Sequence, residues 1–147
     1  MLGNHLSLNS SRNGNISFNN TLEGNQLLNI NAGTGAVQFN NTVGKKSPLT
    51  GLEITAGKVN ANSLNISQSG LRINATLPVE LNDTLNINRR GSTTITSSGN
   101  ISTRKIISEG GVNLTSNGDI NNRGGIDTSS TINGGKINLT SNNGAVN

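Results

Sequence analysis

The stretch GNISFNNTLEG at residues 14–24 reappears as GAVQFNNTVG at residues 35–44, at an offset of 21 residues. The leading glycines, an Asn-Asn-Thr triplet and the only two phenylalanines of the chain, Phe18 and Phe39, coincide in this alignment. Such self-similarity at a fixed period is typical of repeat architectures, in which each unit stacks on the one before.

Two further alignments place the rest of the chain in the same pattern. VNLTSN at residues 112–117 matches INLTSN at residues 137–142 at an offset of 25. LNINAG at residues 28–33 matches LEITAG at residues 52–57 at an offset of 24. The repeat is therefore about 21–25 residues long, and we expect the extra length to lie in loops.

Short apolar-polar alternations fill the repeats, for example Leu64-Asn65-Ile66 and Leu71-Arg72-Ile73. Apolar residues two positions apart lie on one side of a strand. A parallel β-helix needs equivalent residues at a constant period, because each coil lies about 4.8 Å above the last and like side chains stack in ladders. We therefore predict an all-β protein, a parallel β-helix of about six coils of 20–25 residues.

The alignments also predict which side chains form ladders and where the repeats begin. Aliphatic and aromatic ladders are expected inside, and Asn ladders at the corners. The expected structural ladder consists of Phe18 with Phe39, Asn19 with Asn40, Asn20 with Asn41, Val112 with Ile137, and Leu114 with Leu139. Residues 14–147 are predicted to form the repeat segment, and residues 1–13 an irregular or frayed N-terminal segment.

The composition fits a thin core and argues against a chemical site. Asn, Gly, Ser and Thr make up 79 of the 147 residues, and aromatic residues only 1%. One histidine and no cysteine make a catalytic triad or a zinc site implausible, so we predict no catalytic, metal or cofactor-binding residues and no enzyme activity. The net charge is +4, but the basic residues are scattered and have no aromatic residues among them, which argues against nucleic-acid binding. No apolar run is long enough to span a membrane.

The repeats GNISFNNT (residues 14–21), LNINAGTGAV (residues 28–37) and IDTSSTINGGKINLTSNNGAV (residues 126–146) resemble the arrays of filamentous-haemagglutinin-like exoproteins. The likeness is strongest to large secreted or surface proteins of cyanobacteria. It implies a right-handed β-helix within a large protein exported by the two-partner (type V) route, with an outer-membrane transporter for the parent protein. The chain itself shows no signal peptide, and its last coil has no polar cap, so we expect a segment of a longer array.

The function expected from these observations is a non-catalytic structural and adhesive module, extracellular or at the cell surface, whose partners are polysaccharides or cell-surface components. One alternative is a polysaccharide-binding or polysaccharide-cleaving β-helix, and cleavage would need a pair of neighbouring carboxylates. Glu23 and Glu53 fall at different coil positions and do not supply that pair. Another alternative is a truncated gene fragment of a larger exoprotein.

Overall fold

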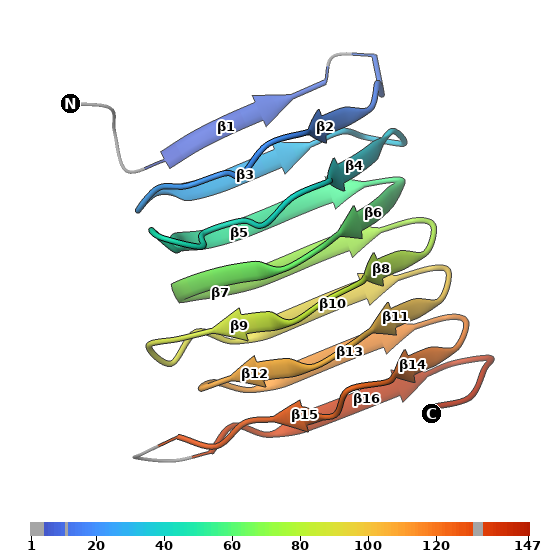
Figure 1. The fold of residues 1–147 in the computed structure, drawn as a ribbon. Helices are drawn as coiled ribbons and strands as arrows, with labels where there is room; N and C mark the ends of the chain where they lie inside the picture. Colours follow the sequence, from blue (N-terminus) through green and yellow to red (C-terminus); the bar gives the residue numbers. More distant parts are fainter. Residues whose placement is uncertain (1–4, 11, 131–133) are drawn as a thin grey trace.

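The structure is a computed structural model that describes residues 5–10, 12–130 and 134–147, and it shows a parallel β-solenoid. The chain winds right-handed through about six coils, each running out along one long face and returning along two shorter ones (Figure 1). The predicted all-β parallel β-helix is thereby confirmed. The described residues contain no helix, and hence none that could cross a membrane.

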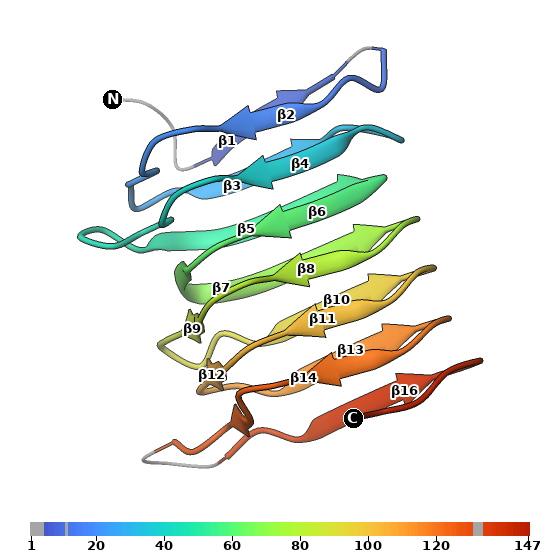
Figure 2. The same ribbon diagram turned by 45° about the vertical axis from the view of Figure 1, so that its right-hand side comes forward.

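The coils build three faces from parallel strands, and Figure 2 shows the second face in front of the first. The first face consists of β1 (His5–Asn9), β3 (Leu27–Asn31), β5 (Leu49–Ala56), β7 (Leu64–Ala75), β10 (Thr93–Ser97), β13 (Val112–Ser116) and β16 (Ile137–Ser141). The second face consists of β2 (Ile16–Phe18), β4 (Ala36–Phe39), β6 (Lys58–Ala61), β8 (Val79–Leu81), β11 (Ile101–Thr103) and β14 (Ile120–Asn122).

A short third face closes each coil. It is formed by the start of β7 with β9 (Leu85–Ile87), β12 (Ile106–Ser108) and β15 (Ile126–Asp127). Strand β7 belongs to two faces because it continues around the corner, pairing with β9 through its first residues and with β10 through its last. The first and third faces therefore form a single hydrogen-bonded sheet.

The register of the faces reproduces the three sequence alignments. Phe18 pairs with Phe39 between β2 and β4, which is the offset of 21. Leu28 pairs with Leu52 between β3 and β5, and Val112 with Ile137 between β13 and β16. Equivalent residues therefore lie directly above one another, as the repeat requires.

The interior is filled by stacked aliphatic side chains. One inward row of the first face consists of Ile30, Ile54, Ile73, Ile95, Leu114 and Leu139. All but Leu139 are buried, and Leu139 packs against the buried cluster from the last coil. The interior of each coil is filled only by the inward side chains of its own strands and is therefore narrow. Two or three aliphatic residues per strand are enough to exclude water from it.

The parallel inward row contains one polar interruption. It runs through Leu28, Leu52, Leu71, Thr93, Val112 and Ile137. Thr93 is fully buried, and its Oγ1 has no hydrogen-bond partner among the described residues. A buried hydroxyl without a partner costs about 1–3 kcal/mol.

Replacing Thr93 by valine is expected to raise the free energy of unfolding by about 1–2 kcal/mol, because the shape is kept and the unsatisfied hydroxyl removed. Urea denaturation followed by far-UV circular dichroism measures the effect. The matched control is Thr103→Val, since Thr103 is also buried but its Oγ1 accepts a hydrogen bond from Asn122 Nδ2 at 2.9 Å. That variant should be destabilised, and equal effects of the two substitutions would contradict the explanation.

The N-terminal segment differs from the expectation of an irregular or frayed region over residues 1–13. His5–Asn9 forms β1, which pairs along its whole length with β3. No aromatic residue or Asn-Asn-Thr triplet marks this strand in the sequence, although Leu6 and Leu8 pair with Leu28 and Ile30. Residues 1–4 and 11 of that segment lie outside the described residues.

Candidate functional site

Two straight rows of polar side chains run along the outside of the first face. Because side chains alternate along a strand, the residues between the inward aliphatic ones point to solvent. One row consists of Ser7, Asn29, Glu53, Arg72, Thr94, Asn113 and Asn138, and the other of Asn9, Asn31, Thr55, Asn74, Thr96, Thr115 and Thr140. We call these two rows the polar rows. Their members repeat at the spacing of the coils, about 4.8 Å.

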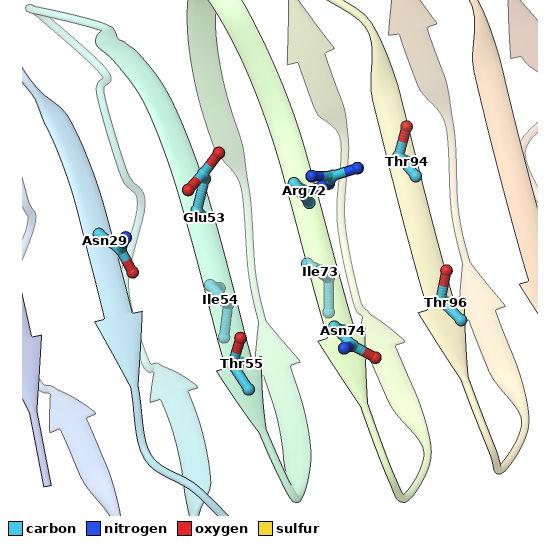
Figure 3. A pocket seen from close by; sticks show the side chains of 9 residues that line it. All are labelled: Asn29, Glu53, Ile54, Thr55, Arg72, Ile73, Asn74, Thr94 and Thr96. Atoms are coloured by element: carbon cyan, nitrogen blue, oxygen red, sulfur yellow. The ribbon is translucent and has the colours of Figure 1, made fainter.

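A shallow depression of about 390 Å³ lies across the middle of the polar rows, over β3, β5, β7 and β10 (Figure 3). Its lining consists of Asn29, Glu53, Ile54, Thr55, Arg72, Ile73, Asn74, Thr94 and Thr96. The outward groups here are amides, hydroxyls, one carboxylate and one guanidinium. They offer both donors and acceptors, which is the chemistry needed to bind a chain of sugar hydroxyl groups.

Glu53 and Arg72 carry the only charges in this depression and occupy neighbouring register positions on β5 and β7. Neither side chain makes a hydrogen bond or an ion pair with any described residue. The ion pair found among the described residues joins Lys58 and Glu80 at 3.3 Å. Their hydrogen-bonding capacity is therefore free for a ligand.

Most of the other carboxylates anchor loops, whereas Glu80 on β8 is ion-paired with Lys58 on β6 and lines a separate, smaller depression. Glu23 Oε2 accepts hydrogen bonds from the backbone N–H groups of Ser47 at 2.8 Å and Lys46 at 3.0 Å. These bonds, that from Ser47 first, hold the pKa of Glu23 below its ordinary value. Glu23 thereby fastens the loop that carries Pro48, the inserted segment behind the 24-residue offset.

Asp83 and Asp127 are engaged in the same way. The hydroxyl of Ser63 donates to Asp83 and lowers its pKa, and Ser129 does the same for Asp127. Glu109 accepts from the Arg90 N–H at 3.1 Å and Asp119 from the Ala145 N–H at 2.9 Å. Counting Glu80 in its ion pair, every carboxylate of the chain except Glu53 therefore has a structural partner.

The basic residues include three adjacent pairs, and all three lie in loops. Lys45-Lys46, Arg89-Arg90 and Arg104-Lys105 are all exposed and outside strands. Arg89 and Arg90 both have positive φ, 55° and 65°, which favours Asn or Gly, so this bend carries local strain. The described residues contain no group of three His, Cys, Asp or Glu side chains that would hold a metal ion.

The predicted ladder residues occupy matching positions. The rings of Phe18 and Phe39 are stacked with their centroids 4.8 Å apart and their planes 5° from parallel. Val112 and Leu114 are buried opposite Ile137 and Leu139 of the last coil.

The predicted Asn ladders form at one of the two positions. Asn40 Nδ2 donates to Asn19 Oδ1 at 2.8 Å. Asn20 and Asn41 are not joined in this way among the described residues, and Asn41 Oδ1 instead accepts from the N–H of its neighbour Thr42 at 2.9 Å. An Asn side chain at these positions thus forms its hydrogen bond either with the neighbouring coil or with the backbone of its own bend.

Sequence reasoning aligned Ser116 with Ser141 but assigned the pair no role. Together with Ser97 they form a row of inward hydroxyls on β10, β13 and β16. A serine at the inward end of a strand, with a glycine two or three residues later, is the signal that identifies the row.

Comparison of the chain with models of protein families, with curated proteins and with solved structures gives no match. The geometry of the described residues is therefore what supports a functional proposal.

Proposed function

We propose that this chain is a non-catalytic structural and adhesive module of a secreted or surface-exposed bacterial protein, and that it binds polysaccharide along the polar rows. The observation that carries the proposal is the straight, register-matched arrangement of hydroxyl and amide groups on the outer side of the first face. An extended polysaccharide presents hydroxyl groups at regular intervals, and a periodic surface meets several of them at once.

The strength expected of this binding is modest for each coil. A single hydrogen bond contributes about 0.5–1.5 kcal/mol net. Phe39 is buried, Phe18 stacks on it with one face, and neither ring belongs to the polar rows. Affinity would come instead from many weak contacts along the solenoid, which combine as in multivalent binding.

The state of the carboxylates supports a non-catalytic role. Glycoside cleavage by the common mechanism uses two carboxylates placed about 5–10 Å apart around the scissile bond. Glu53 lies alone among the carboxylates that line the depression. Glu23 is committed to backbone N–H groups of the loop after the third face.

The test compares the parent chain with the triple variant Thr55→Val, Thr96→Val and Thr115→Val in pull-down assays on cellulose, chitin and cross-linked alginate. Valine keeps the β-branched shape and removes the hydroxyl, so folding should be unaffected. We expect at least one polysaccharide to retain the parent, and the variant to bind it more weakly by a factor of at least about ten, since three hydrogen bonds are lost.

The control is the triple variant Thr21→Val, Thr42→Val and Thr76→Val, whose residues lie outside the polar rows. It should bind like the parent. Retention of the polar-row variant at parental strength would contradict the binding surface. Failure of the parent to bind any of the three polysaccharides would contradict their being its ligands.

A further inference from the structure

The Asn-Gly pairs within the described residues share one local contact. Asn-Gly is the sequence most prone to spontaneous deamidation, because glycine does not shield its backbone nitrogen. In each pair that lies wholly within the described residues, the glycine N–H donates to a serine hydroxyl. The three contacts are Gly14 N to Ser10 Oγ at 2.7 Å, Gly118 N to Ser116 Oγ at 3.0 Å, and Gly144 N to Ser141 Oγ at 2.9 Å.

Two of these serines belong to the row of inward hydroxyls on the first face. The hydroxyl of each member donates to a carbonyl of the preceding coil, so its single proton is already used. The bonds are Ser97 Oγ to Leu77 O at 2.8 Å, Ser116 Oγ to Gly99 O at 2.6 Å, and Ser141 Oγ to Gly118 O at 2.8 Å. Ser116 is the most enclosed member, with no exposed surface.

The chemistry of deamidation shows what this contact prevents. The glycine nitrogen loses its proton and attacks Cγ of the asparagine, a C–N bond forms, and ammonia leaves to give a succinimide. Water then opens the ring to aspartate or isoaspartate. Isoaspartate inserts a methylene group into the backbone, which would shift the register between coils.

We propose that Asn117 is a latent deamidation site that the buried hydroxyl of Ser116 keeps closed. The Gly118 N–H is held by an oxygen whose own proton is committed to Gly99, so the hydroxyl has no proton left to stabilise a deprotonated nitrogen. The electrophilic side chain is restrained as well, because Asn117 Oδ1 accepts a hydrogen bond from Asn142 Nδ2 at 2.8 Å. Both reacting groups are therefore engaged in hydrogen bonds with other residues, which must be broken before the nitrogen can attack.

The experiment incubates the folded chain at mildly alkaline pH and measures the conversion of Asn117 by peptide mass mapping. Ser116→Ala is expected to accelerate deamidation at Asn117 about tenfold, the factor that corresponds to loss of one buried hydrogen bond. Ser116→Thr retains the hydroxyl and should keep the parental rate.

The matched control is Ser97→Ala. Ser97 makes the same two kinds of contact, to the Gly99 N–H at 3.1 Å and to the preceding coil, but its bend contains Ser98 in place of asparagine. This variant should leave the rate at Asn117 unchanged. Equal acceleration in both alanine variants would show that general loosening of the solenoid is responsible and would overturn the proposal.

If Ser116→Ala does not fold, the protection of Asn117 can be measured on the unaltered chain. Asn117 should deamidate at least about tenfold more slowly in the folded chain than in the same chain unfolded in urea. Equal rates in the two states would overturn the protection. An unchanged rate at Asn117 in a folded Ser116→Ala variant would overturn the role of the hydroxyl.

Discussion

Replacing Gly70 by alanine is expected to lower the free energy of unfolding by about 3 kcal/mol or more. Gly70 lies at the corner where β7 turns from the third face to the first, with φ of 74°. A Cβ there would overlap the carbonyl oxygen of Ser92 in the next coil. That oxygen accepts the Leu71 N–H at 2.9 Å, so the coils cannot move apart without losing a ladder bond.

Gly125→Ala separates the two causes of this effect. Gly125 has a similar φ of 80°, but a Cβ at that position would meet no atom of the described residues within 4 Å. In this variant the free energy of unfolding should fall only by the cost of placing alanine in a left-handed conformation, about 1–2 kcal/mol. Urea denaturation of both variants gives the comparison, and equal losses would show that the spacing between coils does not constrain Gly70.

The second large effect is expected at Phe39, whose replacement by alanine should cost about 3–5 kcal/mol. Phe39 is 1% exposed, stacks on Phe18 in the coil before, and is followed in register by Ala61 in the coil after. Phe39 lies between the half-buried ring of Phe18 and the small side chain of Ala61, so its own ring fills the interior of this coil. Its loss leaves a cavity that the rigid stack of strands cannot close.

Two controls define the origin of the loss at Phe39. Phe39→Leu keeps most of the apolar volume and should be clearly less damaging than alanine. Phe18→Ala removes the same ring from a half-buried position in an outer coil and should also cost less than Phe39→Ala. Thermal unfolding monitored by circular dichroism ranks the three variants, and an equal loss for Phe18→Ala and Phe39→Ala would contradict the core role of Phe39.

The alignments of Phe18 with Phe39 and of Val112 with Ile137 show why this fold is readable from its sequence. In a solenoid, residues that contact each other across coils are chemically alike, so long-range contacts appear as repetition along the chain. The row of pairs that continues into the third face repeats most strictly: Leu22, Val43, Leu64, Leu85 and Ile106 pair in succession at intervals of 21 residues. Elsewhere the spacing varies because loops at the corners absorb insertions at little cost.

The candidate site was only partly predictable. Alternation indicates that Glu53 and Arg72 point outward, but not that both lack a partner while Glu23 does not. The ladder of Asn19 and Asn40 followed from their alignment. The equally well aligned Asn20 and Asn41 do not form one, because Asn41 bonds to its own bend, and no pattern of residue types distinguishes the two outcomes.

The all-β solenoid, the period of its coils and the inward aliphatic rows can be predicted from the sequence, because they depend on side-chain alternation and on repetition. The three-dimensional arrangement of the coils is needed to show that β1 pairs with β3, that Gly70 must lack a Cβ, and that Ser116 joins two coils. These features depend on the distance between atoms of neighbouring coils. That distance is set by hydrogen bonds between strands about 20 residues apart, and no local pattern of residues records it.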